Sequence, residues 1–461
     1  MLLPVATLAV ALALLAPDGA PARAPDGAPG VSMKPCTVRG YSARCGTLLV
    51  PENRARPAGR KIGLRVVVVP SWRKPARPDA FTYLAGGPGA AASEMTDSVM
   101  SIWSDVNATR DILLVDQRGT GRSNPLSCSP PAEPIEKPAR MRAFVRSCLR
   151  AAPGDMRLYG TRAAMDDLEA VRVALGYRQL NVYGTSYGAT AAQVYLKRHP
   201  ASVRTVVLDS GTAIDVSFYG RFAPNAEQAL AQVAKRCAAD RACSRAYPNW
   251  RGQLSALIRR WDARPVRNRK GETIDGAGLA GVIQGMLRDA GDAAEIPFLV
   301  SRTAAGNYQR LNEQVNDDGP TLQLMFWSIW CNEPWVGLGA RGPWRTDFDG
   351  YTRSSIAFHR QACSYLPKRA EPASAWTSPR SRVPLLALAG GADPQDPISN
   401  LPRLKQLWPN GRAIVVPHLG HAIGQEGCLG ELVTRFVARG SADGLDTRCV
   451  KKIKPPMFEL P

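Results

Sequence analysis

The chain has 461 residues and a formal net charge of +20, from 59 Lys and Arg against 39 Asp and Glu. This length can bury a large core and exceeds that of a minimal domain. Because the arginines are spread along the chain without a nucleic-acid motif, we expect a solvated basic surface and no nucleic-acid partner.

The N-terminus carries a short apolar run, Leu2 to Ala16, followed by the small residues Ala20-Pro21-Ala22. This pattern predicts a signal peptide over residues 1–22, although it lacks an N-terminal Lys or Arg. An uncleaved anchor is the alternative, and the run is short for a membrane span. We therefore expect a secreted, periplasmic or cell-envelope protein with no stable membrane partner.

The ten cysteines fall into close sequence neighbours, which is typical of disulfides in an exported protein. We expect no metal site, since the sequence has neither paired CxxC motifs nor a His/Cys cluster. The neighbouring cysteines are Cys36 with Cys45, Cys128 with Cys148, Cys237 with Cys243, Cys331 with Cys363, and Cys428 with Cys449.

Eight short apolar or β-branched runs predict strands, and the later ones are continuous, as in parallel strands covered on both faces. A helical pattern over Arg162 to Leu175 separates two of them. The alternation predicts a doubly wound α/β sheet that is mostly parallel. The runs are Gly46–Val50, Ile62–Val69, Phe81–Leu84, Ile112–Asp116, Leu180–Tyr183, Thr205–Asp209, Pro384–Ala389 and Ala413–Pro417.

A glycine-flanked serine, Gly184-Thr185-Ser186-Tyr187-Gly188, lies between a predicted strand and a predicted helix. In this position Gly-x-Ser-x-Gly is the nucleophile elbow of the α/β-hydrolase fold, where a sharp turn exposes the serine hydroxyl. The backbone amide of Tyr187 is the first expected donor to a reacting oxyanion. The second should come from Gly86-Gly87-Pro88-Gly89, with Gly87 or Gly89 near the donor.

Between Gly211 and about Arg382 the sequence becomes helix-like and rich in tryptophan. We interpret residues 213–381 as a helical cap inserted after the sixth predicted strand and folded over the active site. The predicted core then comprises residues 34–212 and 382–461.

A serine nucleophile needs a base and an orienting acid, which follow it in this fold in the order acid, then base. His421 is the expected base because it follows the last strand in a glycine-containing loop. The other three histidines are His199 at a helix end, His359 in the cap, and His418 beside the strand end.

Asp393, after the penultimate strand, is the expected acid. Asp396 is interpreted as a turn residue, and Asp209 as a weaker substitute for the acid.

The ordered motifs resemble those of the prolyl and tripeptidyl aminopeptidase family of α/β-hydrolases. They are Ala85 to Gly89, Val115 to Ser123, Gly184 to Gly188, Asp393-Pro394 and Gly420-His421. The resemblance implies that Ser186, Asp393 and His421 form the triad. In that family a histidine often precedes the Gly-Gly-Pro-Gly motif, and Ala85 stands there in this chain, which leaves substrate preference open.

The resemblance implies a serine exopeptidase that needs no cofactor and cleaves peptides with a free N-terminus. Such an enzyme must hold an ammonium, and Glu333 in the cap is the candidate, with a structural role as the alternative. The alternative functions are a carboxylic ester hydrolase of the same fold and a non-catalytic envelope binding protein.

Overall fold

A computed structural model describes residues 31–128, 135, 137–268, 271, 273–314 and 324–461. The predicted signal peptide, residues 1–22, lies outside the described residues. None of the helices in the described stretches is long and apolar enough to cross a membrane.

The central sheet has nine strands among the described residues, in the order β1-β2-β3-β5-β4-β6-β7-β10-β11. From β5 to β11 neighbouring strands are parallel, whereas β1, β2, β3 and β5 pair antiparallel. The strands are β1 (Lys34–Val38), β2 (Tyr41–Pro51), β3 (Lys61–Val69), β4 (Ala80–Leu84), β5 (Ile112–Val115), β6 (Leu180–Thr185), β7 (Val203–Asp209), β10 (Leu385–Gly390) and β11 (Gly411–Val416).

The prediction of eight strands was wrong, because it missed β1. This strand, with the sequence KPCTV, lies at the edge of the sheet and is largely exposed. An exposed edge strand needs no apolar run, so the sequence carries no periodic signal for it. The helical region therefore follows the seventh strand in chain order rather than the sixth.

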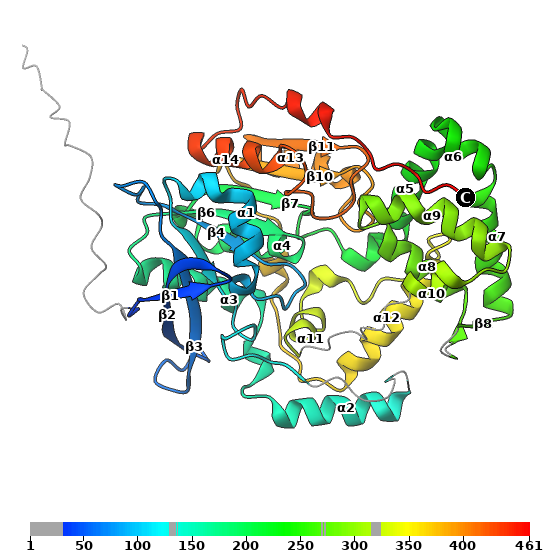
Figure 1. Cartoon of the computed structure of the whole chain (residues 1–461). Coiled ribbons are helices and arrows are strands. Elements are labelled where there is room, and N and C mark those ends of the chain that lie inside the picture. Colours follow the sequence, from blue (N-terminus) through cyan, green and yellow to red (C-terminus); the bar gives the residue numbers. More distant parts are fainter. Residues whose placement is uncertain (1–30, 129–134, 136, 269–270, 272, 315–323) are drawn as a thin grey trace, which may run out of the picture.

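Helices cover both faces of the sheet, as Figure 1 shows. On one face α1 (Thr96–Asn107) and α14 (Leu429–Arg439) pack together, and on the other α3 (Thr161–Ala174) packs against α4 (Tyr187–Arg198). Neighbouring strand residues therefore enter opposite clusters: Val206 packs on the α3–α4 side and Val207 on the α1–α14 side. This explains the continuous apolar runs of the parallel strands.

The chain between β7 and β10 consists, in its described part, of helices joined by loops and of the short ribbon of β8 and β9. Much of it packs around a buried cluster of its own. We call the segment from α5 to α12, residues 218–364, the helical insertion. It contains α5 (Phe218–Ala239), α6 (Arg241–Ala246), α7 (Trp250–Ala263), β8 (Val266–Arg267), β9 (Thr273–Ile274), α8 (Gly276–Met286), α9 (Ala290–Ala304), α10 (Gln309–Gln314), α11 (Leu324–Trp330) and α12 (Asp349–Ser364).

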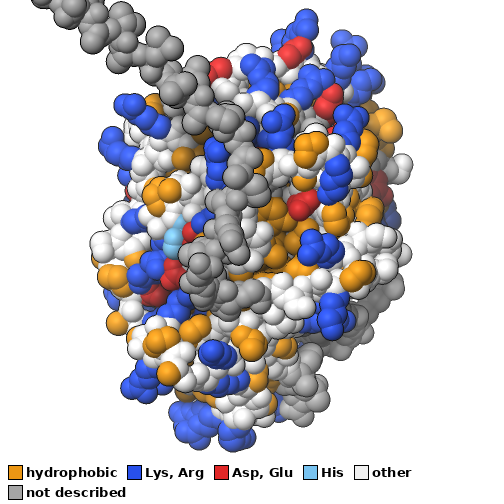
Figure 2. Space-filling model, turned by 90° about the vertical axis from the view of Figure 1, so that its left-hand side faces the viewer, with side chains coloured by type: hydrophobic (Ala, Val, Ile, Leu, Met, Phe, Trp, Pro, Cys, Tyr) orange, Lys and Arg blue, Asp and Glu red, His pale blue; other side chains and the backbone are white. Residues whose placement is uncertain are grey.

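The remaining α-helices of the described residues are α2 (Pro138–Ala151) and α13 (Leu401–Leu407). All ten cysteines are paired, and the five disulfides join the sequence neighbours that were expected. Figure 2 shows Lys and Arg side chains scattered over the viewed face rather than gathered in one patch, as expected for a solvated basic surface.

Candidate active site

Ser186 occupies the turn between β6 and α4 with φ 56° and ψ −122°, a conformation that is strained for a residue with a side chain. The flanking glycines make the turn possible. A Cβ on Gly184 would lie 2.2 Å from the carbonyl oxygen of Gly188, and one on Gly188 would lie 2.0 Å from that of Leu84. The turn places Ser186 at the carboxyl edge of the sheet, where it lines a pocket.

The loop after β4 lies against the same serine. A Cβ on Gly86 would lie 3.3 Å from the Cβ of Ser186, so glycine permits this close approach. Gly87 has φ +111° and lines the pocket together with Ser186 and Tyr187. Between the two positions that the sequence left open, Gly87 and Gly89, Gly87 is therefore the one that borders the pocket.

Asp116 and Arg118 brace this region with separate partners. The Asp116 carboxylate accepts hydrogen bonds from the amide and hydroxyl of Ser93, at 2.8 and 2.9 Å, and from the amide of Arg122 at 3.1 Å. The buried Arg118 guanidinium donates two bonds, of 2.6 and 2.7 Å, to Asp167. Asp116 thus ties the segment after the glycine loop to the end of β5.

Asp393 and His421 are brought together beyond β10 and β11. The Nδ1 atom of His421 lies 3.0 and 3.1 Å from the two carboxylate oxygens of Asp393. The amides of Gln395 and Asp396 donate to the same carboxylate at 2.8 and 3.0 Å. Four contacts therefore hold Asp393 in one orientation toward the imidazole.

The electrostatics of this pair suit an ionised acid beside a basic imidazole. Burial opposes charge on Asp393, but the charge and hydrogen bond of His421 outweigh it and lower the pKa of Asp393. Burial likewise opposes charge on His421, and the Asp393 carboxylate raises the pKa of His421 above its usual value. The Nε2 atom of His421 is buried without a hydrogen-bond partner in the described part of the chain, which leaves it available to a nucleophile.

The end of β7 holds both reacting loops in place. The backbone carbonyl of Asp209 accepts from the amide of Ser186 at 2.9 Å, and its carboxylate accepts from the amides of Ile423 and Gly424. The hydroxyl of Ser210 accepts from the amide of Ala422 at 2.8 Å. Asp209 therefore positions the loop that carries His421 rather than acting as a substitute acid.

This role of Asp209 and Ser210 was missed by sequence reasoning. The available signal was a polar pair directly after a buried strand, next to the expected elbow.

The other three histidines lie in different surroundings. His199 pairs with Asp166 at 3.0 Å, and the Nδ1 atom of His359 contacts the carbonyl oxygen of Ser355 at 2.8 Å. His418 lines a different surface pocket, together with Arg236. The structure thus brings only His421, of the four histidines, to Asp393.

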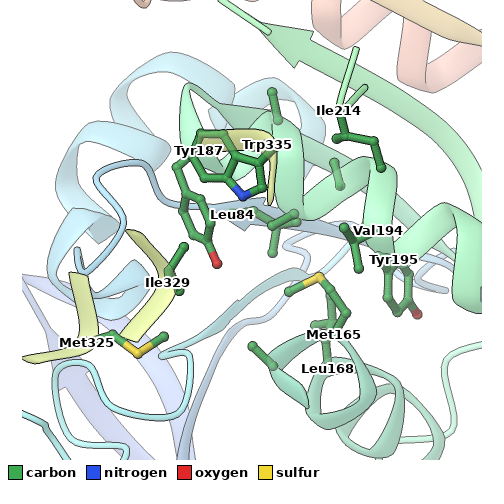
Figure 3. Close-up of a cluster of buried hydrophobic side chains, with 14 of the residues drawn as sticks. Leu84, Met165, Leu168, Tyr187, Val194, Tyr195, Ile214, Met325, Ile329 and Trp335 are labelled. Atoms are coloured by element: carbon green, nitrogen blue, oxygen red, sulfur yellow. The ribbon is translucent and has the colours of Figure 1, made fainter. Parts of the chain in front are cut away.

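The pocket at Ser186 is walled by residues from both parts of the fold. Apolar, aromatic and polar side chains all contribute to it, from the loops after β7 and β10 and from the helical insertion. Figure 3 shows Trp335 of the insertion beside Tyr187, and their rings lie 6.2 Å apart at 30°. The lining residues are Gly87, Ser186, Tyr187, Thr190, Thr212, Ala213, Ile214, Val216, Ser217, Phe218, Arg221, Asn225, Trp330, Trp335, Gln395, Asp396 and Asn400.

Glu333 does not line this pocket. Its side chain is fully buried, and its carboxylate accepts from the amide and hydroxyl of Thr161 at 2.8 Å each and from Trp335 Nε1 at 2.9 Å. Arg369 pairs with it at 3.4 Å. Burial raises the pKa of Glu333 to about 7 against the opposing charge of Arg369. These contacts favour the structural role and not the amine-binding role expected from the sequence.

Three side chains could geometrically hold a metal ion: ligand atoms of Asp393, Asp396 and His421 lie within 4.8 Å of one another. The donors around Asp393 are the imidazole and two backbone amides, a pattern that orients a carboxylate toward a base. We therefore interpret the group as acid and base, with Asp396 beside them.

Known proteins resemble this chain to different extents. The chain is 29% identical to the tripeptidyl aminopeptidase of Streptomyces coelicolor over 187 residues, 36% of this chain and 35% of that protein. It is 28% identical to the serine protease Hip1 of Mycobacterium tuberculosis over 226 residues, 44% of this chain and 42% of that protein. The match to both relatives thus spans less than half of their length.

A longer match joins it to carboxylesterase B of Mycobacterium tuberculosis, 29% identical over 408 residues, which is 80% of this chain and 70% of that protein. The model of the alpha/beta hydrolase fold family matches residues 81–427. This range runs from β4 through the elbow and the helical insertion to the loop after His421. The chain therefore belongs to the α/β-hydrolase fold family.

Proposed function

We propose that this protein is an exported serine exopeptidase that cleaves peptide bonds near a free N-terminus. The observation that carries the proposal is the convergence of three features on one site. Ser186 stands in a strained elbow, Gly87 and Tyr187 border the same pocket, and His421 is paired with Asp393 nearby.

In this mechanism Ser186 attacks the peptide carbonyl while the Nε2 atom of His421 takes its proton. Asp393 keeps the imidazole in the required tautomer and stabilises the imidazolium. The backbone amides of Gly87 and Tyr187 stabilise the oxyanion. His421 then protonates the leaving amine, and water attacks the acyl-enzyme by the same route.

The peptidase class is supported by the similarity to a tripeptidyl aminopeptidase and a serine protease. Export is supported by five disulfides, since such bonds persist in oxidising compartments. We keep residues 213–381 as the proposed bounds of a cap over the site.

A second candidate function is hydrolysis of carboxylic esters. The match to carboxylesterase B, over 80% of this chain, favours it. Both functions use the same triad and oxyanion donors, so only the substrate distinguishes them.

The test compares nitroanilides with a nitrophenyl ester. Prolyl and tripeptidyl nitroanilides are assayed with a free and with an acetylated amine, beside the Ser186→Ala variant. We expect hydrolysis of the amides that depends on the free amine and on Ser186. Turnover of the ester alone, indifferent to the amine, would replace the peptidase by the esterase. Failure of Ser186 to react with a fluorophosphonate would instead indicate a non-catalytic envelope binding protein.

A further inference from the structure

A second carboxylate lies beside the imidazole of His421. Asp396 Oδ2 is 3.9 Å from His421 Nδ1, whereas Asp393 Oδ2 is 3.0 Å away. The Asp393 side chain has no exposed surface, but 17% of the Asp396 side chain remains exposed, and Asp396 lines the pocket that holds Ser186. Asp393 is therefore enclosed by the protein, whereas Asp396 is accessible from the pocket.

The Asp393 and Asp396 carboxylates also differ in their hydrogen-bond partners. Asp393 is bound by the imidazole and two backbone amides, whereas Asp396 has a hydrogen bond from Thr212 and lies near two further carboxylates, Asp393 and Asp209. Burial and the charge of Asp393 raise the pKa of Asp396 to about 7. With two carboxylates beside one imidazole, this position favours an added positive charge, which is either a proton on Asp396 or a bound cation.

The protein itself does not supply that charge among its described residues. Arg221 lines the same pocket but forms no ion pair with Asp396. The charge of Arg288 opposes protonation of His421, and the Arg288 carbonyl accepts from the His421 amide. Asp396 is also the one carboxylate among the residues that line the pocket. Glu333, the carboxylate expected from the sequence, is saturated by Thr161, Trp335 and Arg369.

The surroundings of Asp396 are fixed by neutral polar contacts. Asn400 donates to Thr212 Oγ1 at 2.7 Å, and Asn225 of the insertion donates to the carbonyl oxygen of Gln395 at 3.0 Å. All four of these residues line the pocket. They tie the Asp396 loop to β7 and α5, so the carboxylate is held in a prepared position.

Resting on the proposed function, we propose that Asp396 binds the N-terminal ammonium of the substrate and sets the number of residues released. The carboxylate lies on the Nδ1 side of His421, whereas Nε2 serves the serine. The amine of a single terminal residue is only two bonds from the reacting carbonyl carbon and stays on the Nε2 side. The amine at Asp396 then belongs to a residue farther along, so the released product is a short peptide.

The remaining pocket walls fit such a product. Ile214, Phe218, Trp330 and Trp335 provide apolar contact for its side chains, and no second carboxylate among the lining residues competes for the amine. The substrate class is therefore a peptide with an unblocked N-terminus and small or apolar residues in the first positions.

The experiment compares wild type with Asp396→Asn on a tripeptidyl nitroanilide, with a free or an acetylated amine, and on prolyl nitroanilide. In wild type the free tripeptide is preferred over both other substrates. In Asp396→Asn, kcat/KM for the free tripeptide falls about 30-fold or more, as for loss of one partner of a buried charge pair. The ratio of free to acetylated substrate then approaches one. Any change in the pKa of His421 affects both substrates, so it cancels in this ratio.

Two variants serve as controls. Asp396→Glu keeps the charge and retains part of the preference for the free amine, while Glu333→Gln changes both substrates by the same factor. Thermal unfolding of each variant shows that it is folded before rates are compared. A ratio unchanged in Asp396→Asn, with the wild-type preference intact, overturns this proposal alone. A wild type without preference for the free amine overturns both this proposal and the proposed function.

Discussion

The carboxyl edge of the sheet and the helical insertion hold their polar groups in different ways. At the edge, the partners are mostly backbone amides of the loops that follow β10 and β11: two amides orient Asp393, and Asp209 accepts from the amides of Ile423 and Gly424. In the insertion, Glu333 is held mainly by side chains far along the chain, among them Thr161 and Arg369.

The difference suggests separate roles: the sheet edge positions the reacting groups, and the insertion stabilises the fold. These loops follow strands of the sheet, so their backbone amides can position reacting groups with little freedom. Side-chain contacts such as those of Glu333 join the insertion to α3 and to the elbow through Tyr187 and Trp335. We therefore expect changes at the edge to abolish catalysis and changes in the insertion mainly to lower stability.

The largest effect is expected from Ser186→Ala. Removing the nucleophile should lower kcat for amide hydrolysis by about 10⁶-fold, as in other serine hydrolases. The matched control is Ser98→Ala, an exposed serine of α1. Steady-state rates on the tripeptidyl nitroanilide check this, and substantial residual activity would mean that another group attacks the carbonyl.

Asp393→Asn should lower kcat by about 10⁴-fold, because an amide leaves the imidazole in the wrong tautomer. Asp105→Asn, at an exposed position of α1, is the control. Stability should change far less than rate, which thermal unfolding can verify. A loss of fewer than about ten-fold would assign the acid to another carboxylate, with Asp396 the nearest.

Replacing both Cys331 and Cys363 by serine should lower the free energy of unfolding by about 3–4 kcal/mol, from the 32-residue separation that the disulfide closes. This bond joins the end of α11 to α12 inside the insertion. Denaturant unfolding measures the change, while kcat of the folded fraction should stay near the wild-type value. If the kcat of the folded fraction also fell strongly, the insertion would contribute to catalysis as well as to stability, which would contradict the distinction between the two regions.

Glu333→Gln should cost about 1–3 kcal/mol of stability, since the amide group places donors against Thr161 and Arg369, which are themselves donors. The same denaturant titration measures it. A neutral effect would show that Glu333 is protonated in the folded protein, in keeping with its raised pKa.

The smallest expected effect is on the pH profile. The base must be neutral to act, and Asp393 raises the pKa of His421. The acidic limb of kcat/KM should therefore have its midpoint above the ordinary histidine value of about 6.5, with activity lost as pH falls through it. A midpoint below that value would indicate that burial outweighs the carboxylate.

Most of the edge could be predicted from the sequence because short-range motifs specify it. Gly184 and Gly188 leave no space for a side chain, so the elbow is visible as a pattern. The helix predicted over Arg162 to Leu175 is observed as α3, one residue earlier at each end. Strand β1 was not predicted, because an exposed strand has no apolar pattern in the sequence.

The surroundings of Glu333 in the insertion and of Asp396 beside His421 were less predictable from the sequence. Whether Glu333 faces the pocket depends on Thr161 and Arg369, which no local pattern connects to it. The sequence predicts a turn residue at Asp396, and its amide does donate to the Asp393 carboxylate, but its distance from His421 depends on how β10 and β11 place their loops. Both outcomes depend on long-range packing.

The most direct test of the account is to trap the acyl-enzyme. Rapid acid quenching of the protein with a tripeptidyl nitrophenyl ester, followed by mass spectrometry, locates the bound acyl group. We predict one tripeptidyl group on the peptide that contains Ser186, and none in Ser186→Ala. Hydrolysis with no covalent adduct, or an adduct on another residue, would contradict the assignment of Ser186 as the nucleophile.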